Sequence, residues 1–154
     1  METEKVRNTV SKIKIIKFEN SIAVIFPDTY SKNIFIHPDK VSGVFTPSES
    51  TIRYIEENLS ANFDVLITER QKPYFGTKIF KKDLQKYDKQ YFGFINKNKD
   101  SIVSGIIINF ESDPFKVKSK LEKDALFCND GWCDSNRLEF YFNINSRKFL
   151  NMEQ

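Results

Sequence analysis

Two apolar runs joined by a short polar segment dominate residues 89–110, which read KQYFGFINKNKDSIVSGIIINF. The first run, residues 91–95, is aromatic and β-branched, and the second, residues 102–110, is nearly continuous in Ile and Val. The polar residues 96–100 between them have the length of a hairpin connection. This stretch therefore predicts the central hairpin of an antiparallel sheet, around which the rest of the chain has to be arranged.

Further strands are predicted on both sides of this hairpin. Residues 21–26 (SIAVIF) have no polar face, so we expect them to be buried on both sides. Residues 137–144 (RLEFYFNI) alternate, which predicts Glu139, Tyr141 and Asn143 on the solvent side. The remaining candidate strands are residues 12–18, 34–36 and 148–150, an irregular strand within 71–80, and residues 63–67 as a strand or a packed helix exit.

The clearest local signal predicts a helix over residues 47–60. Thr46 and Glu49 have the spacing of a capping box around Pro47, in which each side chain accepts from an otherwise unpaired backbone amide. Apolar residues then recur at helical spacing, with charged residues placed away from them: Ile52, Ile55 and Leu59 on the stripe, and Arg53, Glu56 and Glu57 off it.

The 154 residues are enough for one domain with its own core. We expect a loose N-terminus over residues 1–10 and a single α+β domain over residues 11–150. Residues 81–87 predict one or two helical turns, and residues 113–121 predict a short helix or an extended segment. The predicted architecture is one main helix packed on a curved antiparallel sheet of five to seven strands, a cystatin-like roll or a related fold.

The charge balance disfavours a dedicated nucleic-acid-binding surface. Lys and Arg number 24 and Asp and Glu number 21, a net charge of +3. Two lysine clusters, within residues 78–89 and 116–123, are interleaved with acids and predict a solvated basic face. No apolar run approaches the roughly 20 residues that span a bilayer. The first residues lack the apolar core of a signal peptide, so we expect a cytoplasmic protein or an exported one whose leader has been removed.

The residue types needed for catalysis or metal binding are sparse. Cys128 and Cys133 have too few partners for a zinc site, because His37 is the single histidine. The two thiols are expected to be free, with a small disulfide loop as the alternative. Asp130, Asp134 and Asn136 offer oxygen ligands near a tight turn but lack the ligand pattern of a calcium loop. We therefore expect no catalytic site, no cofactor and no metal.

Several of these segments together form a wider pattern. Residues 85–96 (QKYDKQYFGFIN), an Ile-rich strand, the Asp130-Gly131 pair and an alternating strand ending in residues 143–145 follow one another in order. This order resembles small uncharacterised bacterial proteins, mainly over residues 85–150, and the helix after Thr46 resembles the helix that precedes it there. Trp132 stands where those proteins usually have a second Gly. The resemblance implies a helix-plus-sheet unit and no particular activity.

The sequence hypothesis for function is a non-enzymatic protein-binding domain, of the inhibitor, immunity or envelope-accessory type. Its expected contact surface is the loop of residues 129–136, where an aromatic on a Gly-bearing loop is a common anchor. The candidate contact residues are Trp132, Asp130, Asp134 and Asn136. A Trp132 packed under the sheet is the structural alternative. The alternative functions are a nucleic-acid-binding module that uses a Lys/Tyr face and, least favoured, a small hydrolase.

Overall fold

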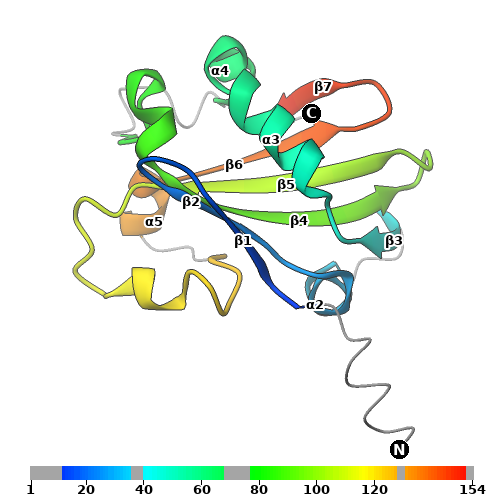
Figure 1. Cartoon of the computed structure of the whole chain (residues 1–154), viewed down its shortest axis with the longest axis horizontal. Helices are drawn as coiled ribbons and strands as arrows, with labels where there is room; N and C mark the ends of the chain where they lie inside the picture. The colour runs from blue at the N-terminus through cyan, green and yellow to red at the C-terminus, as the bar shows by residue number, and fades with distance from the viewer. Residues whose placement is uncertain (1–11, 36–39, 68–76, 128–130, 152–154) are drawn as a thin grey trace, which may run out of the picture.

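The computed structural model describes residues 12–35, 40–67, 77–127 and 131–151, and in these residues a seven-stranded sheet forms the centre of the molecule (Figure 1). The predicted loose N-terminus, residues 1–10, lies outside the described residues. The strands are β1 Lys14–Lys17, β2 Ile22–Ile25, β3 Val41–Phe45, β4 Asp88–Asn96, β5 Ser101–Ile108, β6 Arg137–Asn143 and β7 Lys148–Asn151.

The sheet has the order β1-β2-β4-β5-β6-β7, and β3 pairs with the second half of β4. All pairs are antiparallel except β2 with β4, which are parallel. The β4–β5 hairpin is at the centre, as the sequence predicts, and the fold class is α+β with a mostly antiparallel mixed sheet. The sheet is not strongly curled, so the expected cystatin-like roll is not confirmed.

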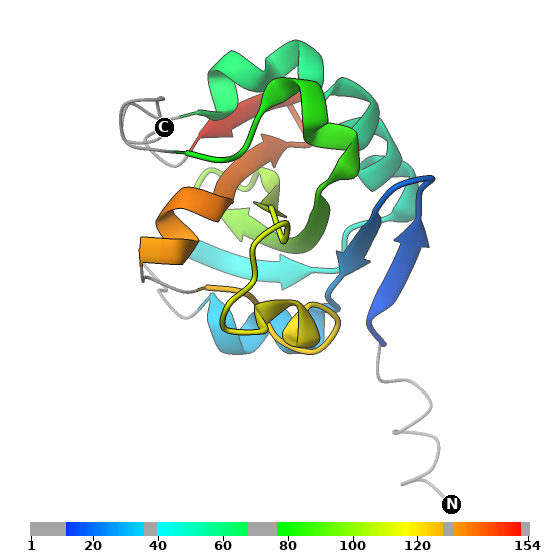
Figure 2. The same cartoon turned by 90° about the vertical axis from the view of Figure 1, so that its left-hand side faces the viewer.

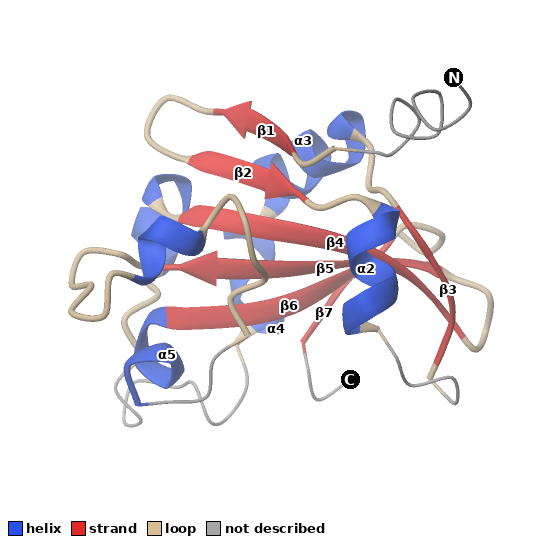
Figure 3. Cartoon of the chain, turned by 90° about the horizontal axis from the view of Figure 1, so that it is seen from below, coloured by secondary structure: helices blue, strands red, loops and turns tan. Residues whose placement is uncertain are grey.

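Short helices cover both faces of the sheet (Figures 2 and 3). Within the described ranges, the α-helices are α2 Asp28–Ile34, α3 Glu49–Asn58, α4 Phe63–Leu66 and α5 Gly131–Asn136, and the 3-10 helices are η1 Ser60–Asn62, η4 Lys81–Lys86 and η5 Val117–Lys120. Helices α3, α4 and η4 lie on one side, here called the α3 face. Helix α2, the segment around η5 and the Trp132 ring of α5 lie on the other side, the α2 face.

Each face has its own hydrophobic core, and β4 contributes to both. Tyr91 packs with Ile52, Ile55 and Leu59 of the helix region on the α3 face, so the predicted apolar stripe is confirmed as buried. The next residue, Phe92, packs with Phe26, Leu121 and others on the α2 face. Successive strand residues point to opposite faces, which is why a strand covered on both sides has no polar face.

Burial on both sides corrects the prediction for β6. Glu139 and Asn143 were expected on the solvent side, but they are only 9% and 8% exposed. Tyr141 is half-buried and packs edge-on against Phe94. The alternation in the sequence is real, but the second face is covered rather than solvated. The two-sided burial predicted for residues 21–26 is confirmed for Ala23 through Phe26, which are fully buried.

The region before the main helix differs from the prediction. The strand expected at residues 34–36 is wrong, because α2 occupies Asp28–Ile34 and residue 36 lies outside the described residues. Tyr30 and Ile34 are four residues apart, so a helix places both against the α2-face core. Strand β3 was not predicted, because Ser42 and Gly43 interrupt its apolar pattern.

Helix α3 begins at a different cap from the predicted one. The Ser48 side chain caps it, accepting from the Thr51 amide at 3.2 Å, so the capping box of Thr46 and Glu49 is wrong. The Thr46 hydroxyl instead accepts from the Asp28 amide at 2.9 Å and ties α2 to the start of α3. Residues 63–66 are a packed helical exit, the second of the two options for that segment.

The segment around η5 is attached to the sheet by one buried amide. Gln90 of β4 is fully buried, and its Nε2 donates to the carbonyl oxygens of Leu121 and Asp124 at 2.8 and 2.7 Å. Its Oε1 accepts from the Leu126 amide at 2.8 Å. One side chain thereby forms hydrogen bonds with three backbone groups of this segment.

Candidate functional site

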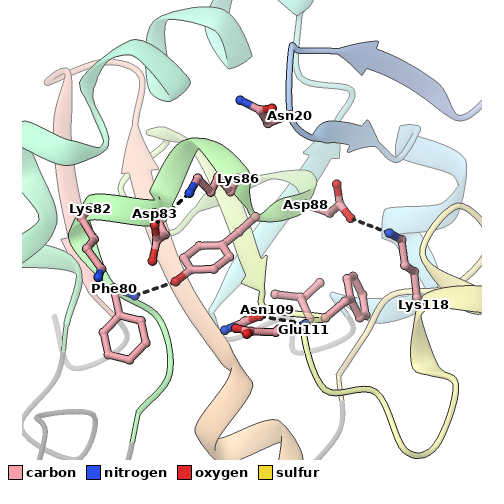
Figure 4. Close-up of a pocket in the computed structure, with 12 residues that line it drawn as sticks. Asn20, Phe80, Lys82, Asp83, Lys86, Asp88, Asn109, Glu111 and Lys118 are labelled. Carbon is pink, nitrogen blue, oxygen red and sulfur yellow. Dashed lines mark hydrogen bonds and ion pairs between the residues drawn. The ribbon is translucent and has the colours of Figure 1, made fainter.

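A hollow of about 840 Å³ opens at the end of the sheet where β4 begins and β5 ends (Figure 4). Helix η4 and Phe80 form one wall, and Lys118 of η5 stands on the opposite side. Asn20, from the turn between β1 and β2, closes the top, and residues 108–111 lie below. The hollow thus brings together segments that are almost one hundred residues apart in the sequence.

Tyr87 and Asn109 hold the floor of the hollow. The Tyr87 hydroxyl accepts from the Phe80 amide at 3.0 Å and donates to the Lys78 carbonyl at 3.3 Å. Burial raises the pKa of Tyr87, and the charges of Asp83 and Glu111 add to this. Asn109 donates through Nδ2 to the same Lys78 carbonyl at 2.9 Å, and its Oδ1 accepts from the Glu111 amide at 2.9 Å. These bonds make the floor a fixed polar surface.

The rim carries three lysines whose side chains extend toward solvent. Lys86 is 3.5 Å from Asp83, and Lys118 is 3.7 Å from Asp88, with the two lysine side chains 68% and 63% exposed. Asp88 also accepts from the Ile22 amide at 2.9 Å, so it is fixed against the β2 backbone. Lys82 is the third exposed lysine on the rim. Long, exposed pairs of this kind contribute little to stability and leave the ammonium groups accessible.

Lysines from both clusters of the sequence meet at this hollow. Lys82 and Lys86 come from the first cluster and Lys118 from the second. Lys89, counted with the first cluster as part of a solvated face, is instead fully buried. Aromatic rings lie among the lysines: Phe80 is 46% exposed, and Phe110 is half-buried beneath the Lys118 ammonium, 5.8 Å from it.

Helix α5 contains most of the predicted contact loop and contacts residues that line the hollow. Trp132 is half-buried, stacks on Phe110 with ring centroids 6.3 Å apart, and donates from Nε1 to the Ser112 carbonyl at 2.6 Å. Asn136 is buried, donates to the Trp132 carbonyl, and accepts from the Asn109 amide at 2.8 Å. Asp134 is exposed, and Asp130 lies outside the described residues.

Two expectations about this loop are corrected. Residues 131–136 are helical rather than a tight turn. Cys133 is buried and disulfide-bonded, so the expected free thiol is wrong and the alternative holds for this residue. The one other cysteine of the chain, Cys128, lies outside the described residues, as does His37.

A second cluster of polar groups lies inside the α3-face core. Lys89 Nζ is 3.0 Å from Glu56 Oε2 and donates to the Tyr87 carbonyl at 2.9 Å. Burial is the largest influence on both groups: it raises the pKa of Glu56 and lowers that of Lys89, against the attraction between them. Glu56 was predicted on the solvated face of the helix, but it lies four residues after Ile52, within the apolar stripe, and is 3% exposed.

Sequence reasoning found some of these groups and missed others. The rim lysines stood out as clusters, and Trp132 as a lone aromatic. Phe80, Asp88 and Asn109 carry no motif that marks them. The i, i+4 spacing of Ile52 and Glu56 was the available signal for the buried carboxylate.

Comparisons with protein-family models, with curated proteins and with solved structures find no match. Among the described residues, no group of three or more His, Cys, Asp and Glu side chains is placed to hold a metal ion. No helix in the same part of the chain has the length and apolar character to cross a membrane.

Proposed function

We propose that this protein is a non-enzymatic domain that binds another protein through the hollow at the start of β4. An inhibitor, an immunity protein or an envelope accessory protein would act in this way. The observation that carries the proposal is the meeting of an exposed ring, Phe80, a half-buried ring, Phe110, and three exposed lysines around one recess (Figure 4). Aromatic residues are enriched in protein interfaces, and the residues that dominate binding energy cluster in pockets of this kind.

The chemistry of the rim favours a partner segment with an apolar side chain flanked by carboxylates. Phe80 offers its exposed ring to the apolar side chain, beside the half-buried ring of Phe110. Asp88 accepts from the Ile22 amide and lies 3.7 Å from Lys118, and Asp83 lies 3.5 Å from Lys86, so these two acids offset part of the positive charge of the rim. The lysine ammonium groups extend beyond them, on stems that can cover apolar surface. Glu111 is an exposed acid at the same hollow, and its negative charge offsets part of the positive charge of the lysines.

The predicted contact residues have two roles in this proposal. Trp132 and Asn136 position the floor of the hollow through Phe110 and Asn109. Asp134 is exposed and remains a candidate for direct contact at the edge. Cys133 of α5 is disulfide-bonded, and stable disulfides occur mainly in oxidising compartments. We therefore favour an exported protein over the cytoplasmic one expected from the first residues.

A nucleic-acid role has one specific observation in its favour, which is that lysines from both clusters, Lys82, Lys86 and Lys118, lie in the same hollow as Phe80 and Phe110. Single-stranded nucleic acids bind to such combinations of cations and stacking rings. This alternative predicts an affinity for oligo(dT) that falls steeply with salt, because each neutralised phosphate releases counterions. No measurable binding at low salt would remove it.

The experiment that tests the main proposal is affinity capture from the native source with three forms of the full chain. The first is the wild type, and the second carries Phe80→Ala with Lys86→Glu at the rim. The third carries Lys97→Glu in the turn at the other end of β4, as a matched charge control. We expect a protein that the wild type and the control retain and the rim variant loses. A partner retained equally by all three forms would contradict the assignment to the hollow.

A further inference from the structure

Three buried side chains meet beneath α3, away from the hollow. Glu56 projects from α3, and Lys89 and Tyr91 project from β4 on the α3 face. Lys89 and Tyr91 are fully buried, and Glu56 is 3% exposed. None of the three lines the hollow, and the side chains around them belong to the apolar core. The cluster is therefore closed to solvent and to ligands.

The polar atoms of this cluster are poorly satisfied. Lys89 has one hydrogen bond, to the Tyr87 carbonyl, and its contact with Glu56 at 3.0 Å. By strict geometry neither Glu56 oxygen nor the Tyr91 hydroxyl completes a hydrogen bond, although the hydroxyl lies close enough to the Glu56 carboxylate to interact with it. An ionised carboxylate has about four acceptor positions. A buried ion pair with so few supporting hydrogen bonds is costly, and each unpaired group calls for an explanation.

We propose that Lys89 and Glu56 form an intramolecular isopeptide bond, with the Tyr91 hydroxyl placed to assist the reaction. The ammonium proton first passes to the carboxylate, which leaves a neutral amine and a carboxylic acid. The Nζ lone pair then forms a bond to Cδ of Glu56, while the Tyr91 hydroxyl donates a hydrogen bond to the oxygen that becomes negative. An Nζ proton moves to the hydroxyl group of the former acid, the C–O bond breaks, and one water molecule leaves. No oxidant or co-reactant is needed.

The core favours both the reactants and the product of this step. Burial shifts the pKa of Glu56 up and that of Lys89 down, in each case toward the neutral form that reacts. In water, hydration of the two ions opposes amide formation, and that hydration is missing here. The amide keeps its N–H donor for the Tyr87 carbonyl and offers its remaining oxygen to the Tyr91 hydroxyl. All of the poorly satisfied atoms then gain a partner or are removed.

Other lysine–carboxylate pairs between described residues lack these conditions. Lys86–Asp83 and Lys118–Asp88 are separated by 3.5 and 3.7 Å, and their lysine side chains are largely exposed. Hydration keeps such pairs ionised, so we expect both to remain unlinked. They serve as internal controls in the same molecule.

The test is the intact mass of the folded full chain, measured after denaturation, reduction and alkylation. We expect the wild type to be lighter than its sequence by one water molecule and the Lys89→Met and Glu56→Leu variants to have their full masses. Trypsin does not cleave after an acylated lysine, so the wild type should yield a branched peptide of residues 54–70 and 87–97. A wild type at its full sequence mass, without this peptide, would overturn the proposal whatever the variants do.

Peptide mapping also separates the bond from another loss of water. The Asp130-Gly131 pair can cyclise to a succinimide, and that loss would be confined to residues 124–137. Water loss found only there would contradict the isopeptide bond. The Tyr91→Phe variant tests the hydroxyl, because it keeps the ring. Its bond should form at least about ten-fold more slowly in a time course that starts from newly synthesised, unlinked chain, as expected when a hydrogen-bond donor to the developing negative charge is lost. An unchanged rate would remove Tyr91 from the mechanism.

Discussion

Lys89 and Gln90 are neighbours on β4, both fully buried, and their side chains enter opposite faces of the sheet. On the α2 face, Gln90 makes three hydrogen bonds to backbone groups of one loop segment. On the α3 face, Lys89 brings a charge that meets one carboxylate and one carbonyl. A neutral amide is thus fully satisfied on one side, while a charged pair is only partly satisfied on the other.

This difference shows two ways in which a strand can attach the layers that cover it. The amide fixes an irregular segment that has little regular structure of its own, because its donors and acceptor match those of the backbone. The charged pair links α3 to the sheet at the cost of desolvation, which makes it sensitive to mutation and to pH. The isopeptide bond proposed above would convert the second kind of attachment into a covalent one.

The largest expected effect comes from leaving Lys89 without its partner. Glu56→Leu should lower the free energy of unfolding by about 3–5 kcal/mol, because the ammonium remains buried and unpaired. Urea denaturation would measure this. The double variant Glu56→Leu/Lys89→Met removes both charges and should recover about 3 kcal/mol relative to the single variant. If the double variant were no more stable than the single one, an uncompensated charge would not be the cause of the loss.

The matched change on the other face is Gln90→Leu. It removes the hydrogen bonds that the Leu121 and Asp124 carbonyls and the Leu126 amide make to Gln90. We expect a loss of about 3 kcal/mol, since each buried group left unpaired costs about 1–3 kcal/mol and some will reach water. The m-value should stay close to that of the wild type. A loss below the resolution of the measurement would show that the amide does not hold the segment.

A smaller effect is expected from pH in the Lys89→Met variant. Burial raises the pKa of Glu56 in the folded chain, and this variant lacks the opposing charge of Lys89. The folded state then binds more protons than the unfolded state above pH 4.5, the ordinary value for the carboxyl. Stability should be greatest below that pH and fall as pH rises through the raised pKa, by up to about 1.4 kcal/mol per pH unit.

The control for this pH dependence is the double variant Glu56→Leu/Lys89→Met, measured by urea denaturation over the same range. It lacks both titrating groups of the cluster, so the difference between the two variants isolates Glu56. An identical pH dependence in the two variants would mean that burial does not shift the pKa of Glu56 in the folded chain.

The smallest effect on stability is expected at the rim of the hollow. Lys86→Ala removes an exposed ammonium 3.5 Å from Asp83 and should change the free energy of unfolding by no more than about 0.5 kcal/mol. Its effect should appear instead in the affinity for the captured partner. A loss of several kcal/mol in stability would place Lys86 among the structural residues and weaken the functional assignment.

The sequence predicts the elements whose pattern is local and repeated. The β4–β5 hairpin, the buried strand β2 and the stripe of Ile52, Ile55 and Leu59 follow from apolar spacing alone. Helices α2 and α5 were missed because helices of six or seven residues depend on tertiary packing rather than on their own propensity. Their contacts, such as Tyr30 and Trp132 on the α2-face core, involve residues far away in the chain.

The candidate site was predicted only in pieces. The two lysine clusters and Trp132 could be picked out as residue types, but their meeting at one hollow depends on the strand order, which the sequence pattern does not specify. Gln90 and Lys89 both read as strand residues, and nothing local shows that each would be buried. The polar groups that hold the layers together were therefore found only in the structure.

Hydrogen–deuterium exchange in the wild type, Glu56→Leu and Gln90→Leu tests the central comparison most directly, because it reports on each layer separately. We expect Glu56→Leu to increase exchange in α3 and to leave residues 117–127 protected. We expect Gln90→Leu to increase exchange in residues 117–127 and to leave α3 protected. Loss of protection in the same segments in both variants would contradict the view that neighbouring residues of β4 hold the two covering layers independently.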